Sequence, residues 1–210
     1  MARFPLPALV WTMVFLAVLI WSGIGPKDRA TWVLEVLPAV IGLVLVAWCV
    51  VRFPLTPMLY WLILIHAVIL MVGGHYTYAE VPLFDWLGDW FGWERNNYDK
   101  LGHFAQGFVP ALIAREVVIR LGVFARPGWR SFFIVSFCLA FSAFYELIEW
   151  WVALASEEAA ESFLGTQGYV WDTQSDMAWA LSGAILALIL LGRLQDRQIR
   201  SLDRSAGYSP

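Results

Sequence analysis

Long apolar stretches dominate this sequence, and they limit the folds that are open to it. Hydrophobic residues make up 60% of the 210 residues and charged residues only 15%, against about 25% charged residues in a soluble domain. A membrane-spanning helix needs roughly 20 mostly apolar residues. Six stretches approach or reach that length: 6–24, 33–51, 57–73, 99–121, 131–154 and 173–192. The sequence therefore predicts an all-α, polytopic membrane helix bundle with about six transmembrane helices.

These six stretches use more than half of the chain and leave no room for a separate soluble domain. Residues 1–210 are therefore expected to form a single integral membrane domain that ends in a polar cytoplasmic tail at 194–210. The apolar run after Arg3 resembles a signal peptide, but it is long enough to span and offers no clean cleavage site before Pro26. We expect the first helix to be retained.

The sequence does not indicate a nucleic-acid-binding protein or a disulfide-stabilised one. No basic stripe on a soluble module points to nucleic acid. Cys49 and Cys138 lie inside apolar stretches, which is typical of small buried thiols rather than of a disulfide framework.

Basic residues in short loops predict the orientation, because cytoplasmic loops carry an excess of Lys and Arg. With a cytoplasmic N-terminus, ten basic residues fall on the inner side: Arg3, Arg52, Arg115, Arg120, Arg126, Arg130, Arg193, Arg197, Arg200 and Arg204. The outer side then holds four: Lys27, Arg29, Arg95 and Lys100. This bias predicts that both termini are cytoplasmic.

Residues 83–93 are too few to span, and their aromatic side chains recur at helical spacing. We expect a short interfacial helix on the outer side, where tryptophan is favoured. It would serve either as an aromatic anchor or as a lid over a site. A second short outer helix is expected at 157–164.

Titratable side chains gather at one end of the predicted spans. Seven lie in or beside apolar stretches: His75, Asp99, His103, Glu146, Glu149, Asp172 and Asp176. Because successive spans alternate in direction, all seven are expected at the outer membrane face. Charged groups in hydrocarbon are costly and commonly mark a site, a relay or a partner.

The spacing of these residues places them in pairs. Three pairs share a helix face: Asp99 with His103, Glu146 with Glu149, and Asp172 with Asp176. Carboxylate and carboxylate–histidine pairs on facing helices are how helical bundles build metal sites. The sequence thus predicts a carboxylate–histidine centre in one outer cavity.

Simpler explanations compete at several of these positions. Asp99 and Asp172 fall where helices start, and Asp is a favoured N-cap. His75 could be an ordinary interfacial histidine, and His66 a core residue or an interhelical hydrogen-bond residue. Capping does not explain Glu146 and Glu149, because they lie near a helix C-terminus, where the helix dipole disfavours a carboxylate.

Charge balance favours a bound cation. Two nearby bases, Arg95 and Lys100, do not neutralise five carboxylates, so several acids hold protons or a divalent ion is present. Imidazole with carboxylate suits Zn, Mn or Fe better than Mg or Ca. We expect five metal ligands, namely Asp99, His103, Asp172, Asp176 and His75. Glu146 and Glu149 are expected to be catalytic, as a general base or a further ligand.

Three sequence motifs are similar to motifs of a known group of proteins. They are Asp99-Lys100-Leu101-Gly102-His103-Phe104, Tyr145-Glu146-Leu147-Ile148-Glu149-Trp150, and Gly165-Thr166-Gln167-Gly168 leading to Trp171-Asp172-Thr173-Gln174-Ser175-Asp176-Met177. Together, over about residues 30–195, they resemble the YjdF-like family of multi-pass bacterial inner-membrane proteins. The first motif is also similar to VanZ-like membrane proteins. The resemblance implies a place in the bacterial inner (plasma) membrane and carries over no catalytic residue.

Three functions remain open. The first is a metal-dependent membrane hydrolase or transferase for a lipid-linked or periplasmic small-molecule substrate, although G-x-S-x-G, H-E-x-x-H and phosphate-loop motifs are absent. The second is a proton- or cation-coupled transporter, which the lack of an internal repeat disfavours. The third is a structural or accessory membrane protein, which five carboxylates against two bases make awkward.

Overall fold

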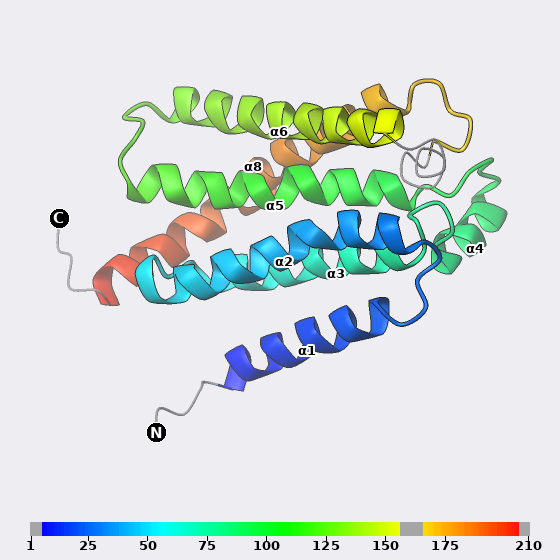
Figure 1. Cartoon of the computed structure of the whole chain (residues 1–210). Coiled ribbons are helices and arrows are strands. Elements are labelled where there is room, and N and C mark those ends of the chain that lie inside the picture. The colour runs from blue at the N-terminus through cyan, green and yellow to red at the C-terminus, as the bar shows by residue number, and fades with distance from the viewer. Residues whose placement is uncertain (1–5, 156–165, 206–210) are drawn as a thin grey trace.

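The computed structural model describes residues 6–155 and 166–205, and these form seven helices (Figure 1). The helices are α1 (Leu6–Ser22), α2 (Arg29–Arg52), α3 (Pro57–His75), α4 (Pro82–Phe91), α5 (Tyr98–Arg120), α6 (Pro127–Ala155) and α8 (Asp172–Ser205). The described residues contain no strand. The all-α bundle expected from the sequence is confirmed.

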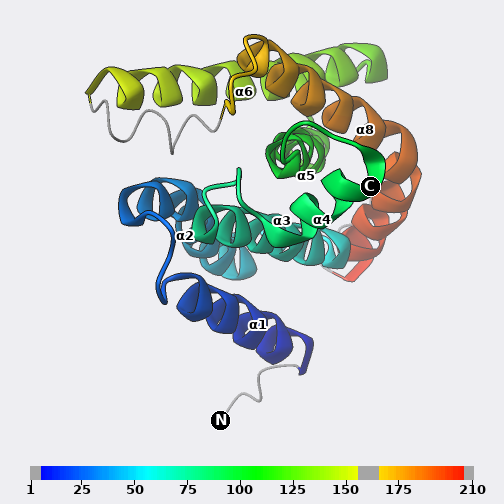
Figure 2. The same ribbon diagram turned by 90° about the vertical axis from the view of Figure 1, so that its right-hand side faces the viewer.

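Helix α5 is the centre of the bundle, with α3, α6 and α8 packed around it (Figure 2). Its crossing with α8 is close because both helices carry glycine there. A Cβ atom on Gly107 would overlap the carbonyl of Ala180, and one on Gly183 would overlap the carbonyl of Phe104. Small residues at a crossing let two helix backbones approach each other, as is common inside membranes. This crossing fixes where the polar N-terminal turns of α5 and α8 meet.

Four helices are long and apolar enough to cross a membrane, namely α2, α3, α6 and α8. Helix α1 has 17 residues and falls just short in length. Helix α5 has 23 residues but carries charged side chains at both ends. Large hydrophobic residues such as Val44, Phe132 and Ile189 are exposed on the outer surface of the bundle, as expected for a surface that faces lipid.

Several helices end at other residues in the structure than the sequence predicted. Helix α3 continues two residues past the predicted stretch 57–73, to His75. At this end Gly73 leaves room for the ring of Tyr78, and Gly74 packs on α2. Helix α8 extends through most of the predicted polar tail, to Ser205. Its extension is anchored by Gln195, which is fully buried against α5. The outer helix predicted at 157–164 lies outside the described residues.

The short helix predicted at 83–93 is present as α4. Trp86, Trp90 and Phe91 are exposed on it, which suits an aromatic element at the membrane interface. Gly92 ends the helix in the left-handed conformation, at φ 69°, where glycine carries no steric cost. Below we call the end of the bundle that carries α4 the α4 end.

The N-terminus of α2 is capped by Asp28, whose side chain accepts a hydrogen bond of 2.7 Å from the backbone N–H of Thr31. This bond lowers the pKa of Asp28 below its ordinary value of 3.8. Asp28→Ala should lower the free energy of unfolding by about 1 kcal/mol, measured by SDS titration in dodecyl maltoside micelles. The contribution is complete above pH 3.8 and should fade as pH falls through the lower pKa of the folded state. Asp89→Ala, at an exposed position on α4, should change nothing.

Candidate metal centre

Three helices deliver the predicted pairs to one buried place at the α4 end. The first turns of α5 supply Asp99 and His103, and Gln106 follows one turn later. The last third of α6 supplies Glu146 and Glu149, and the first turn of α8 supplies Asp172 and Asp176. All of these side chains except Asp99 are buried, and Asp99 is half-buried. The predicted convergence of α5, α6 and α8 is therefore observed.

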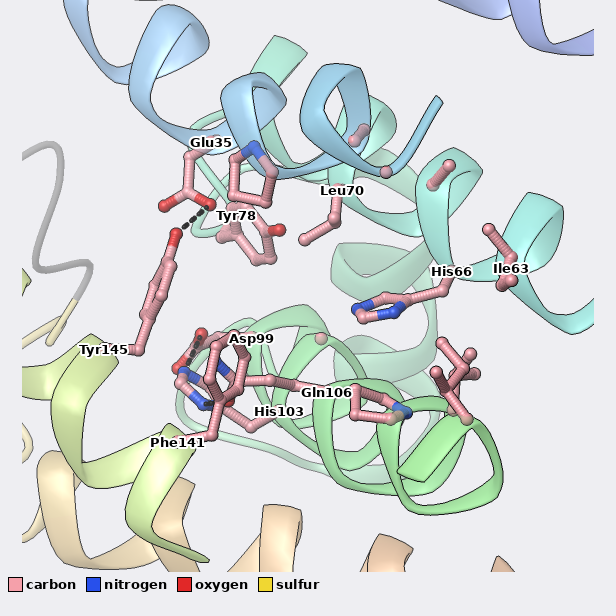
Figure 3. A pocket seen from close by; sticks show the side chains of 18 of the residues that line it. Glu35, Ile63, His66, Leu70, Tyr78, Asp99, His103, Gln106, Phe141 and Tyr145 are labelled. Carbon is pink, nitrogen blue, oxygen red and sulfur yellow. Dashed lines mark hydrogen bonds and ion pairs between the residues drawn. The ribbon is translucent and has the colours of Figure 1, made fainter. Parts of the chain in front are cut away.

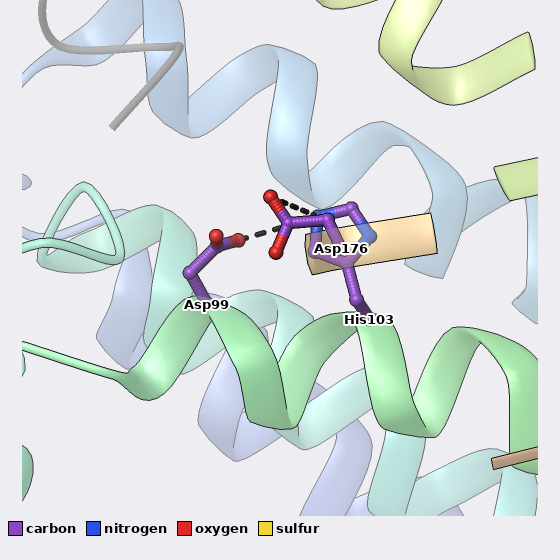
Figure 4. A group of neighbouring side chains, drawn as sticks. All are labelled: Asp99, His103 and Asp176. Carbon is purple, nitrogen blue, oxygen red and sulfur yellow. Dashed lines mark ion pairs between the residues drawn. The ribbon is translucent and has the colours of Figure 1, made fainter. Parts of the chain in front are cut away.

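His103 lies at the middle of this cluster. Its Nδ1 is 3.0 Å from the amide oxygen of Gln106. This contact orients the imidazole so that Nε2 is directed at the acids. Three carboxylate oxygens surround Nε2. Asp99 Oδ1 lies at 3.3 Å and Asp176 Oδ2 at 4.0 Å (Figure 4), and Glu146 Oε1 lies at 3.8 Å.

Two sets of residues have the dimensions of a metal site. Asp99, His103 and Asp176 form one, and His103, Glu146 and Glu149 form the other. In each set the potential ligand atoms lie within 4.8 Å of one another. Ligand atoms about 2.1 Å from one tetrahedral ion lie about 3.4 Å apart. These side chains would therefore have to approach one another by up to about 1.4 Å to hold a divalent cation together.

The aspartates of α8 already have cationic partners. Lys100 Nζ lies 2.8 Å from Asp172 Oδ1 and 2.6 Å from Asp176 Oδ1. Arg95 Nη1 lies 2.6 Å from the same Asp172 oxygen. Asp172, predicted as a metal ligand, belongs to neither set and is held by two bases instead. It serves to fix the start of α8 against α5.

The glutamates of α6 are placed differently. Within the described residues, neither Glu146 nor Glu149 has a Lys or Arg within ion-pair distance, although each is only 8% exposed. The Oε1 atom of Glu146 is buried and has no hydrogen-bond partner there. Ser142, one turn earlier on α6, is fully buried and its hydroxyl is also without a partner. Buried polar atoms normally have hydrogen-bond partners, so the lack of one at Glu146 Oε1 and at the Ser142 hydroxyl requires an explanation.

A cavity of about 210 Å³ lies beside the cluster, enclosed by α2, α3, α5 and α6 (Figure 3). Its polar end is lined by Glu35, Tyr78, Asp99, His103, Tyr145 and Glu149. The ring of Tyr78 sits between Gly73 and Gly102, and its backbone is left-handed at φ 56°, as is that of Thr77 at φ 55°. Non-glycine residues in this conformation are strained and are found near functional sites.

Sequence reasoning missed Glu35. This residue is buried on α2, and its Oε2 accepts a hydrogen bond of 3.0 Å from the hydroxyl of Tyr145 (Figure 3). The signal was available, because Glu35 is the one acid within the apolar stretch 33–51, and an isolated acid in a span is a site candidate.

The structure does not bring His75 to the cluster. Its Nδ1 lies 2.9 Å from the carbonyl oxygen of Ser22, and its ring lies 4.6 Å from that of Trp21. It belongs to neither set of potential ligands and does not line the cavity. His66 does line the cavity, and its Nε2 has no hydrogen-bond partner among the described residues, so the expected interhelical bond is not observed.

Comparison with known proteins agrees with the resemblance seen in the sequence. Residues 7–197 match the family described as "Predicted membrane protein (DUF2238)". The chain is 53% identical over 184 residues to the inner membrane protein YjdF of Escherichia coli (strain K12), covering 87% of this chain and 88% of that protein. No solved structure matches. The match covers every helix that supplies the centre, and the chain therefore belongs to the DUF2238 family of predicted membrane proteins and is a relative of YjdF.

Proposed function

We propose that this protein is a metal-dependent membrane enzyme of the hydrolase or transferase type. One observation carries the proposal: His103, Glu146 and Glu149 present buried ligand atoms within 4.8 Å of one another, and among the described residues the glutamates have no Lys or Arg partner, only the imidazole of His103 at 3.8 Å from Glu146. Buried carboxylates without a base need protons or a metal ion. Two glutamates that flank a histidine offer a metal both charge neutralisation and an imidazole ligand.

The residues of the cluster would take three roles, as metal ligands, as a general base and as the residue that orients the imidazole. His103 and Glu146, with Asp99 and Asp176 on the other side of the imidazole, would hold a Zn, Mn or Fe ion. When bound, such an ion lowers the pKa of a water molecule or polarises a carbonyl or phosphoryl oxygen. Glu149 borders the cavity and would act as the general base there. Gln106 would orient the imidazole through Nδ1.

The membrane arrangement that accompanies this function has six spans with both termini cytoplasmic. Helix α1 is about 25 Å long, close to the roughly 30 Å of the hydrocarbon core. Helix α5 would tolerate its charges because other helices, rather than lipid, surround it (Figure 2). The α4 end would then face the periplasm of a bacterial inner membrane, the location named for the relative YjdF.

Elemental analysis of the purified protein tests this proposal. The wild type should hold about one equivalent of Zn, Mn or Fe per chain. Replacing one ligand typically weakens a metal site by at least about 10–100-fold, so Glu146→Gln and His103→Ala should be nearly metal-free. Glu94→Gln, at an exposed position beyond α4, should keep its metal. Metal-free wild-type protein that stays metal-free after dialysis against each ion would refute the proposal.

Transport has less support in the structure. On α5, the residues from Gly107 to Ala114 are all apolar or glycine, so no titratable group of this helix links His103 to Arg115. A relay needs closely spaced polar groups. A purely structural role would leave the orphaned Glu146 oxygen unexplained.

A further inference from the structure

The cavity beside the centre is polar at one end only. Away from His103 it continues toward the bundle interior as an apolar arm, with walls that include Gly42 of α2, Ile63 of α3, Ile113 of α5 and Phe141 of α6. From His103 to Ile113 the arm follows ten residues of α5, or about 15 Å. That length is about half of the roughly 30 Å hydrocarbon core, the depth of one leaflet.

The arm also reaches the lipid-facing surface, between α2 and α6. Phe141 lines the arm and is 43% exposed. Helices α2 and α6 are not among the pairs that pack along their length. The bond from Tyr145 to Glu35 joins them at the polar end of the cavity (Figure 3). Beyond that bond, an apolar chain could enter from the bilayer without passing through water.

Gly42 shows that the arm is open space. Glycine inside a helix costs about 1 kcal/mol relative to alanine, and most such glycines have a packing reason. A Cβ atom on Gly42 would meet nothing within 4 Å, whereas one on Gly107 or Gly183 would meet backbone. Gly42 therefore makes no close helix contact and instead widens the arm. The unpartnered Nε2 of His66 is a polar atom in this wall, available to an ester carbonyl or a hydroxyl group.

From these observations we infer that the substrate is a membrane lipid, with the first part of one hydrocarbon chain in the apolar arm, the rest of that chain in the bilayer, and its headgroup at the centre formed by His103, Glu146 and Glu149. This inference rests on the proposed function for the headgroup chemistry. The polar end and the arm form one continuous cavity, which matches the two halves of an amphiphile. The opening between α2 and α6 gives the lipid its path.

Photolabelling tests the inference. The protein is reconstituted in vesicles of phosphatidylethanolamine and phosphatidylglycerol that contain a phospholipid with a diazirine in its acyl chain, and adducts are mapped by mass spectrometry. We expect an adduct on Val109, which lines the cavity but is buried from the outer surface. Gly42→Leu should reduce that adduct about tenfold, the loss expected when about two buried methylene groups are displaced. Gly42→Ala should give an intermediate reduction.

Val44→Leu is the matched control, because it adds bulk to an exposed position of the same helix and should leave the adduct unchanged. Should Gly42→Leu fail to fold, Ile113→Phe fills the arm from the opposite wall and must give the same loss. No adduct on Val109 in the wild type, or an equal adduct in the filled variants, overturns the lipid assignment. Metal content of the same samples separates the two proposals: metal without the adduct refutes only the lipid, and the adduct without metal refutes only the metal-dependent chemistry.

Discussion

Lys100→Met is expected to lower the free energy of unfolding by about 3–5 kcal/mol, the usual cost of removing one partner from a buried ion pair. Lys100 Nζ bonds to both Asp172 and Asp176, and Asp176 is only 2% exposed. Asp172 would keep Arg95, but Asp176 would lose its one short ionic contact. The start of α8 would then carry an uncompensated buried charge. SDS titration in dodecyl maltoside micelles measures the loss.

The other lysine of the chain provides the control. Lys27 forms an ion pair of 2.8 Å with Glu80, and both side chains are more than half exposed. Lys27→Met should therefore have little effect on the free energy of unfolding, because water screens an exposed ion pair. Asp176→Asn added to Lys100→Met should recover much of the stability, because it removes the unpaired charge. Equal losses for the two lysine variants would show that Lys100 does not neutralise the aspartates.

Glu116→Ala should have a similarly large effect, about 3–5 kcal/mol, at the opposite end of the bundle. This glutamate is 0% exposed. It accepts hydrogen bonds from Thr56 N at 2.9 Å and Thr56 Oγ1 at 2.7 Å, and it pairs with Arg120 at 3.2 Å. Because the Thr56 side chain makes no cap bond of its own, Glu116 of α5 shares the capping of α3 with Gln198, whose Oε1 accepts a hydrogen bond of 3.1 Å from the Met58 N–H. The same unfolding measurement applies.

Asp196→Ala is the comparison for this end of the bundle. Asp196 pairs with Arg115 at 2.7 Å, but its side chain is 38% exposed, so water replaces the contact and we expect a loss of about 1 kcal/mol or less. Glu116→Gln keeps one acceptor oxygen and should lie between the alanine variant and the wild type. If Glu116→Ala unfolds no more easily than Asp196→Ala, the capping role is wrong.

The two polar networks differ in a way that separates structure from function. Both carboxylate oxygens of Glu116 accept hydrogen bonds, from Thr56 at the start of α3 and from Gln195 of α8. Holding these helices together is a sufficient role for this network. Around Glu146, one carboxylate oxygen is buried without any donor in the described residues. Natural proteins rarely leave such a group unsatisfied unless something binds it. This contrast favours a site at the α4 end of the bundle and a scaffold at the other.

Several features of the candidate site followed from sequence periodicity. Spacings of three and four residues on α5, α6 and α8 placed the pairs on shared faces, and the alternation of spans brought those faces to one end. On α5, Glu116 and Arg120 are four residues apart, and they pair at 3.2 Å. These relations lie within one helix or depend only on helix direction.

The partners across helices could not be predicted in this way. The sequence named Lys100 as a base near the acids but did not single out Asp172 and Asp176 as its partners. It also did not indicate that Tyr145 bonds to Glu35 or that His75 turns to Ser22. Each depends on how far a helix is rotated about its axis and how closely it approaches its neighbour. Those quantities are set by side-chain packing, such as the backbone contact at Gly107 and Gly183.

The amino-acid sequence by itself determined a helical membrane protein with ionisable pairs near one end, because hydropathy and the helical period are local properties of the chain. The tertiary structure decided which carboxylates are paired with Lys or Arg and which are not, and it formed the cavity that Glu149 borders. Charge compensation and cavity shape are properties of several helices together, and only their packing specifies them.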